Sequence, residues 1–169
     1  MEGKGSKGQE AWPVASEVGE ILISSEEIQR RVGELGEAIS GDYANLEPRL
    51  IGILKGVTPF MADLMRAITI RVTTDYMAIS KYDPASETTS VVRLVKDLDM
   101  SITGKHVLLV EDIIDSGLTM EYVLEILEAR EPASLKVCTL FNKTAQRAVE
   151  LPLDYIGFEL PDVFVVGYG

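Results

Sequence analysis

The segment from Val107 to Thr119 constrains the fold of this chain more than any other. It opens with four apolar residues, 107–110, a pattern typical of a strand that is buried on both faces of a parallel sheet. Residues 119–129 then carry apolar side chains at helical spacing. The polar residues 115–119 are therefore expected to connect a strand to a helix at the carboxyl end of the strand, where α/β proteins bind their ligands.

Strands and helices are expected to alternate along the rest of the chain. Ser24 and Glu27 have the spacing of a capping box, which predicts the start of a helix. The polar segment 80–90 interrupts the pattern and is long enough to form a lid. We expect strands at 21–23, 50–54, 70–79, 91–95, 107–110 and 135–141, and helices at about 24–40, 59–68 and 119–129. This alternation is typical of an α/β fold with a mostly parallel central sheet flanked by helices.

Length and composition suit one globular domain. The chain has 169 residues, of which 46% are hydrophobic and 25% charged, and we expect a flexible tail at 1–16 and a single domain at 17–169. No apolar run approaches the roughly 18 residues of a membrane span, and the N-terminus lacks the apolar core of a signal peptide, so we expect a cytoplasmic protein without membrane contact. The formal net charge of −11 argues against nucleic acid as a partner, because nonspecific binding to it depends on many Lys and Arg.

The loop at 115–119 has the composition of a phosphate site. Gly117 permits a backbone conformation closed to most residues, so successive amides can turn toward one anion. Ser116 and Thr119 add hydroxyl donors. The start of the following helix favours an anion as well, because its first amides lack partners within the helix.

Two acids, Glu111 and Asp112, come directly before this turn. Carboxylates would repel the phosphate unless they faced sugar hydroxyls or a divalent metal, which indicates a phosphorylated ribose held with Mg²⁺. The nucleotide-triphosphate loop is excluded, because no G-x-x-x-x-G-K-[ST] pattern occurs. The run from Val107 to Thr119 instead resembles the phosphoribosyl pyrophosphate binding motif of the type I phosphoribosyltransferases.

The resemblance implies the fold of that family, in which terminal segments form a small hood, and a role for each residue of the motif. Asp115 would be the general base, taking the proton from N7 of a purine as N9 attacks the sugar. Glu111 and Asp112 would hold the ribose hydroxyls and Mg²⁺. The ribose and its 5′-phosphate would be bound by the whole motif: Glu111, Asp112, Asp115, Ser116, Gly117, Leu118 and Thr119.

Two further segments resemble the six-oxopurine members of this family. Leu54, Lys55 and Gly56 end a predicted strand at the position where a Leu-Lys-Gly forms the pyrophosphate loop of these enzymes. Amides freed by Gly56 and the cation of Lys55 can hold a doubly phosphorylated leaving group. Lys81 and Tyr82 open the polar loop where the family carries a Ser-Tyr pair on a flexible flap. Lys81 departs from that pattern, since it replaces the usual serine.

The resemblance places the purine near the end of the chain. Lys143 resembles the family lysine that donates to the purine O6, and an ammonium, which has donors only, fits a six-oxo base and not a six-amino one. Phe164 and Val165 resemble the base-binding pair, in which the ring stacks on the purine. Family members continue past the Gly-Tyr-Gly with an Asp and an Arg, whereas this sequence stops at Gly169. We therefore expect either a longer chain or other groups in these roles, with weak or metal-dependent catalysis by this form.

The implied activity is purine salvage, in which the 5-phosphoribosyl group of phosphoribosyl pyrophosphate passes to N9 of hypoxanthine or guanine to give IMP or GMP and pyrophosphate. Such enzymes use Mg²⁺ and form homodimers or homotetramers. Two alternatives stay open, a phosphoribosyltransferase that prefers xanthine and a regulator of the same fold that binds RNA. Lys143 argues against adenine but not against xanthine, and the net charge of −11 argues against RNA.

Overall fold

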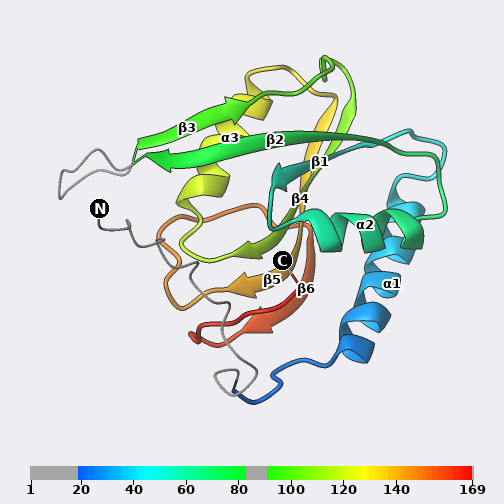
Figure 1. The fold of residues 1–169 in the computed structure, drawn as a ribbon. Helices are drawn as coiled ribbons and strands as arrows, with labels where there is room; N and C mark the ends of the chain where they lie inside the picture. The colour runs from blue at the N-terminus through cyan, green and yellow to red at the C-terminus, as the bar shows by residue number, and fades with distance from the viewer. Residues whose placement is uncertain (1–18, 83–90, 169) are drawn as a thin grey trace, which may run out of the picture.

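A six-stranded sheet lies at the centre of the computed structural model, which describes residues 19–82 and 91–168 (Figure 1). The strands are β1 (Arg49–Leu54), β2 (Thr73–Tyr82), β3 (Val91–Lys96), β4 (His106–Ile114), β5 (Ser134–Lys143) and β6 (Tyr155–Leu160), and the helices are α1 (Ser25–Asp42), α2 (Thr58–Ala67) and α3 (Leu118–Glu128). The order across the sheet is β3-β2-β1-β4-β5-β6, and every neighbouring pair is parallel except β2 and β3. The expected α/β class, with a mostly parallel sheet flanked by helices, is confirmed.

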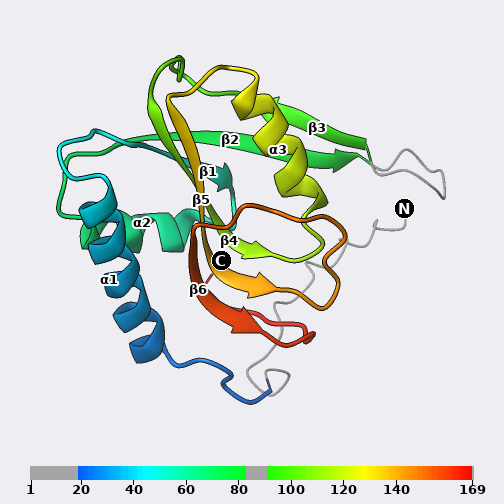
Figure 2. The same ribbon diagram turned by 180° about the vertical axis from the view of Figure 1, so that it is seen from behind.

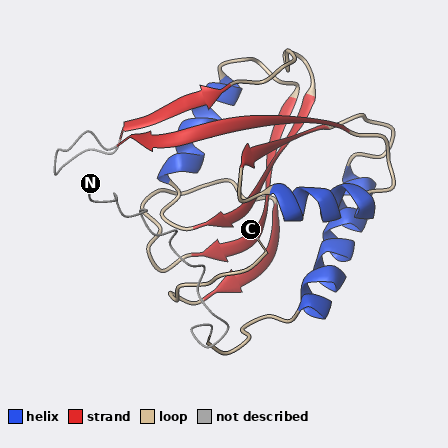
Figure 3. Ribbon diagram, in the orientation of Figure 1, coloured by secondary structure: helices blue, strands red, loops and turns tan. Residues whose placement is uncertain are grey.

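The helices cover both faces of the sheet. Leu108 and Val110 of β4 belong to the core formed with α1 and α2, whereas Val107 and Leu109 belong to the core formed with α3. Figure 2 shows α3 from its own side of the sheet, and Figure 3 shows all three helices around the strands. Because successive side chains of a strand point to opposite faces, a strand between two cores needs apolar residues at every position. This explains the apolar run at 107–110 in β4.

The segment before α1 confirms one prediction and corrects another. Ser24 Oγ accepts a hydrogen bond from the amide of Glu27 (3.2 Å), and Glu27 Oε2 accepts one from the amide of Ser24 (2.8 Å), so the capping box is present. The strand predicted at 21–23 is wrong, because these residues form an irregular segment whose first two side chains are exposed. An apolar triplet makes a strand only where a neighbouring strand accepts its hydrogen bonds.

The carboxyl ends of three parallel neighbours, β1, β4 and β5, meet at one edge of the sheet. Leu54 is the last residue of β1, Lys143 is the last residue of β5, and β4 ends directly before Asp115. Glu111, Ile113 and Ile114 remain paired with β5, so β4 is longer than predicted and both acids before the turn lie within the strand. The residues assigned to the leaving group and the sugar, and Lys143 of those assigned to the base, are thus brought to the same edge.

Two predicted segments lie outside the described residues. One is the tail at 1–16. The other is most of the flap: β2 extends to Lys81 and Tyr82, and residues 83–90 follow outside the described part.

None of the helices in the described ranges is long and apolar enough to cross a membrane.

Two glycines of α1 predict opposite effects of alanine on stability. A Cβ at Gly36 would lie 2.6 Å from Cβ of Ala67 in α2, whereas a Cβ at Gly33 would meet no atom within 4 Å. We expect Gly36→Ala to lower the free energy of unfolding by about 1–3 kcal/mol, because the two helices must move apart. Gly33→Ala should raise it by about 0.5–1 kcal/mol through helix propensity. Urea unfolding of both variants checks this, and changes of the same sign would contradict it.

Candidate active site

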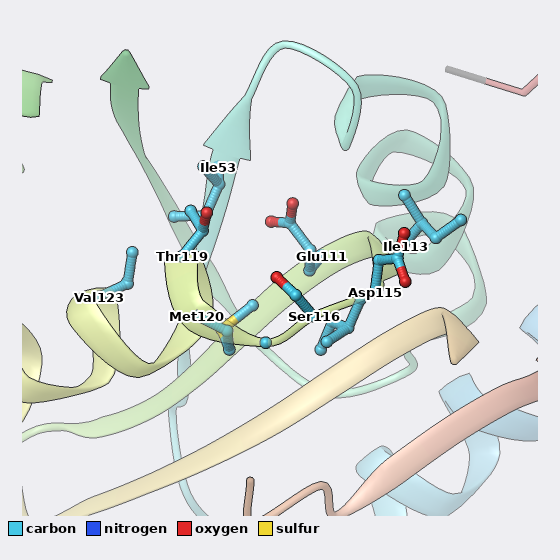
Figure 4. A pocket seen from close by; sticks show the side chains of 10 residues that line it. Ile53, Glu111, Ile113, Asp115, Ser116, Thr119, Met120 and Val123 are labelled. Atoms are coloured by element: carbon cyan, nitrogen blue, oxygen red, sulfur yellow. The ribbon is translucent and has the colours of Figure 1, made fainter. Parts of the chain in front are cut away.

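A pocket opens between the carboxyl end of β4 and the start of α3 (Figure 4). Its volume is about 290 Å³. The lining combines polar side chains of the turn with apolar side chains behind them: Ile53, Glu111, Ile113, Ile114, Asp115, Ser116, Gly117, Thr119, Met120 and Val123. In Figure 4, Glu111 points into the space between Ile53 and Ser116. Five of the seven residues of the ribose-phosphate prediction therefore share one pocket. The other two are Asp112, which faces the turn after β1, and Leu118, whose side chain is exposed.

Gly117 forms the sharp turn that the predicted phosphate-binding loop requires. Its φ is +86°, in the left-handed region that glycine adopts without strain, and it directly precedes α3. A Cβ here would also lie 3.0 Å from Val149 Cγ2 and 3.1 Å from Leu151 Cδ1. No side chain of the described residues caps this end of α3. The first amides of the helix are therefore suited to an anion from outside the chain.

Glu111 and Asp112 form a desolvated pair of acids. Glu111 Oε2 is buried and has no hydrogen-bond partner among residues 19–82 and 91–168. Burial raises the pKa of Glu111 well above its usual value, and the negative charge of Asp112 raises it further. Burial also raises the pKa of Asp112. Adjacent acids whose charged forms are disfavoured in this way are typical of functional sites.

The turn after β1 brings the predicted pyrophosphate loop against these acids. The Leu54–Lys55 peptide bond is cis, and Thr58 closes the turn by donating to Lys55 O from its amide (3.2 Å) and its hydroxyl (2.7 Å). A Cβ at Gly56 would lie 3.1 Å from Asp112 Cγ and would clash with Oδ2 of the same residue. A side chain at this position would require the Asp112 carboxylate to shift, so the predicted pyrophosphate loop lies against Asp112.

Lys143 connects the turn after β4 with the segment after β6. Its side chain is buried, and Nζ lies 3.4 Å from Asp115 Oδ2 and 3.4 Å from Asp162 Oδ1. Gln146 donates to both carboxylate oxygens of Asp162 (3.1 and 2.9 Å), and this hydrogen bonding, together with the Lys143 ammonium, lowers the pKa of Asp162. The sequence pattern does not single out Asp162, and its one signal is its position two residues before Phe164.

Phe164 and Val165 lie apart from the ribose-phosphate pocket. They line a second, apolar depression together with residues 19–23 and Tyr168, so the two ends of the described chain lie together as a hood requires. The ring of Phe164 is 93% exposed, which leaves it available for stacking rather than part of a core. The Tyr168 hydroxyl donates to Asp63 in α2, which ties the last described residues to the body of the fold.

Comparison with known proteins gives the family. Residues 20–169 match the family described as phosphoribosyl transferase domain. The chain is 44% identical to the hypoxanthine-guanine phosphoribosyltransferase of Bacillus subtilis over 90% of this chain and 85% of that protein. It is 47% identical to the hypoxanthine phosphoribosyltransferase of Haemophilus influenzae over 89% of this chain and 86% of that protein.

A solved structure agrees with these relatives. The crystal structure of a hypoxanthine-guanine phosphoribosyltransferase from Bacillus anthracis matches with a TM-score of 0.85 and 46% identity, over 90% of this chain and 90% of that chain. Similarity of sequence and fold over nearly the whole of each chain shows that this protein belongs to the phosphoribosyltransferase family.

Proposed function

We infer that this protein is a purine salvage enzyme that transfers the 5-phosphoribosyl group of phosphoribosyl pyrophosphate to N9 of hypoxanthine or guanine. The products are IMP or GMP and pyrophosphate. The observation that carries this inference is the 3.4 Å distance between Lys143, a donor for the purine O6, and Asp115 at the ribose-phosphate pocket. The names of the relatives refer to hypoxanthine or to hypoxanthine and guanine, and they give no support to a xanthine-preferring enzyme or an RNA-binding regulator.

Asp115 is the proposed general base. N9 of the purine attacks C1 of the ribose as the bond to pyrophosphate breaks, and the N7 proton passes to the Asp115 carboxylate. The carboxylate is half-exposed at the pocket, so a bound base can reach it. Lys143, on the flank of this carboxylate, donates to O6 and thereby selects a six-oxo base.

The remaining predicted residues are proposed to bind the rest of the substrates. The turn at Gly117, with its backbone amides and the start of α3, suits the 5′-phosphate. The loop at 54–56 adjoins the acid pair and suits the pyrophosphate. The other assignments are Ser116, Leu118 and Thr119 for the phosphate, Phe164 and Val165 for the base, and Lys81 and Tyr82 for a flap that excludes water from the reacting sugar.

Glu111 and Asp112 are the residues proposed to hold Mg²⁺, which enzymes of this family use with phosphoribosyl pyrophosphate. The fit rests on the buried, unpartnered Glu111 Oε2 and on the raised pKa of both acids, since a cation would offset the cost of their charges. The described residues contain no cluster of three or more such ligand side chains. Two carboxylates suffice for Mg²⁺, which keeps water and substrate oxygens as its other ligands. The bound ion would supply positive charge to the leaving pyrophosphate.

Three further proposals rest on length, on composition and, for the oligomeric state, on the resemblance to the family. They are a cytoplasmic location, assembly into a homodimer or homotetramer, and a single domain at 17–169 that follows a tail at 1–16.

Replacing the proposed base should remove most of the activity. We expect Asp115→Asn to lower kcat with hypoxanthine and guanine on the order of 10²- to 10⁴-fold, because the amide cannot accept the N7 proton. The spectrophotometric assay with phosphoribosyl pyrophosphate and Mg²⁺ measures this. Asp99→Asn is the matched control. The exposed Asp99 side chain pairs only with Lys96 within residues 19–82 and 91–168, so this substitution should leave kcat unchanged. Unchanged turnover by Asp115→Asn would refute the assignment.

Lys143 should determine which purine is used. Lys143→Gln removes the ammonium but keeps an amide that can donate to O6 or accept from a six-amino group. We expect kcat/KM for hypoxanthine to fall about 10- to 100-fold, the cost of one charged hydrogen bond, while the ratio of adenine to hypoxanthine activity rises. Rates with hypoxanthine, guanine, xanthine and adenine give this ratio. An equal loss for all four bases would contradict a role at O6.

The acid pair predicts a pH-dependent gain in stability for Glu111→Gln. An acid whose pKa is raised in the folded state keeps a proton that the unfolded state releases, so the free energy of unfolding falls as pH rises above the usual glutamate pKa of 4.5. The glutamine variant escapes this loss. We expect it to be more stable than the wild type by about 1–3 kcal/mol at neutral pH, with the difference shrinking as pH falls toward that value.

Urea unfolding at several pH values, without substrate, measures this difference. Glu37→Gln, at an exposed position of α1, is the control and should show no such dependence. Added Mg²⁺ should raise the Tm of the wild type and not that of Glu111→Gln. If the wild type is more stable than Glu111→Gln at neutral pH, other groups must offset the cost of burying Glu111 and Asp112, and the prediction is wrong.

A further inference from the structure

The turn that follows β5 packs against the phosphate-binding turn. The amide of Arg147 donates to Thr144 O (3.1 Å), and the amide of Ala148 donates across to Ser116 O (2.9 Å). Further along the same segment, two apolar side chains lie within contact distance of the position that a Cβ at Gly117 would take. The loop that carries the proposed base is therefore supported from the side of β5.

The Arg147 guanidinium joins acceptors from both turns. Nε donates to the backbone carbonyl of Asp115 (3.0 Å), and a terminal nitrogen donates to Lys143 O (3.3 Å) and to Asn142 Oδ1. Asn142 is buried and is itself held by Glu159, whose two carboxylate oxygens accept from Nδ2 at 2.9 and 3.0 Å. The Arg147 side chain thus hydrogen-bonds the main chain of both Asp115, the proposed base, and Lys143, the proposed O6 donor.

Asp115 and Lys143 lie on segments that are held in different ways. Lys143 ends β5 and takes its position from the sheet, whereas Asp115 is the first residue after β4. The 3.4 Å separation of their side chains therefore depends on how the short loop after β4 is held. Catalytic groups lose much of their effect when they are displaced by as little as an ångström.

We propose that Arg147 is a positioning residue, which sets the spacing between Asp115 and Lys143 by hydrogen-bonding the main chain of both. This inference rests on the proposed role of Asp115. A planar guanidinium suits the task, because its donors point in fixed and diverging directions, whereas a lysine ammonium is a compact charge on a flexible stem. The adjacent Gln146 donates to the carboxylate of Asp162, so the same turn contacts both aspartates that flank Lys143.

The test compares Arg147→Ala in two backgrounds. In the wild-type background we expect kcat with hypoxanthine to fall on the order of 100-fold, with little change in KM for phosphoribosyl pyrophosphate. In the Asp115→Asn background the same change should cost little more, because no carboxylate is left to position. An Arg147→Ala enzyme with near-normal kcat overturns the proposal. So does an equal fold-loss in both backgrounds, which would mark a general structural effect.

Two further variants control for misfolding and for the loss of an arginine in general. Arg147→Lys keeps the aliphatic stem and the charge, so we expect it to fold. It replaces Arg147→Ala in the test if the alanine variant is unfolded at the assay temperature. It should then show the same fall in kcat and the same non-additivity with Asp115→Asn. Arg71→Ala, which removes an exposed arginine paired with Glu47, should leave kcat unchanged. Full activity of Arg147→Lys would show that charge alone suffices and would overturn the proposal.

Chemical rescue gives a second readout. Millimolar guanidinium should restore activity to folded Arg147→Ala, and methylammonium should not, because only the former reproduces the planar set of donors. Absence of rescue, or equal rescue by both ions, counts against the proposal. If Asp115→Asn itself is fully active, the assignment of the base has failed; if it is inactive while Arg147→Ala is normal, only the present inference has failed.

Discussion

Strand β4 occupies the position from which both the fold and the site are built. It pairs with β1 on one side and β5 on the other, and its side chains enter both cores. Backbone hydrogen bonds hold the register of these three strands, so the residues that follow their carboxyl ends start from fixed points. The loop after β1, the turn after β4 and the lysine at the end of β5 meet for this reason, although each belongs to a different strand-and-loop unit.

Charge is distributed unevenly around that edge. A chain with a net charge of −11 must bind a substrate that carries several phosphates. The turn at Gly117 and the start of α3 offer backbone amides for this purpose, and Lys55 offers a cation. The acid pair in β4 has the opposite character, since burial disfavours its charges and one carboxylate oxygen has no partner in the described chain. Such groups lower stability and are typical of positions kept for a ligand.

Local sequence patterns predict some parts of this structure and not others. The capping box at Ser24 and the apolar run of β4 involve neighbours in the chain, and both are present as expected. The strand expected at 21–23 is wrong, because a strand depends on a partner that no local pattern reveals. Asp162 and Arg147 escape sequence reasoning for a related reason. Their partners are remote in the chain, and an aspartate or an arginine on a loop is ordinarily a solvated charge.

The sequence by itself determined the alternating α/β architecture, the glycine turn after β4 with its preceding acids and the family resemblance, because hydrophobic period, turn chemistry and short motifs are local properties of a chain. Only the tertiary structure decided that Lys143 is held between Asp115 and Asp162, that Gly56 touches Asp112 and that Arg147 joins two turns. Those contacts depend on strand register and on which loops the sheet brings together. They are long-range distances, and a linear pattern does not contain them.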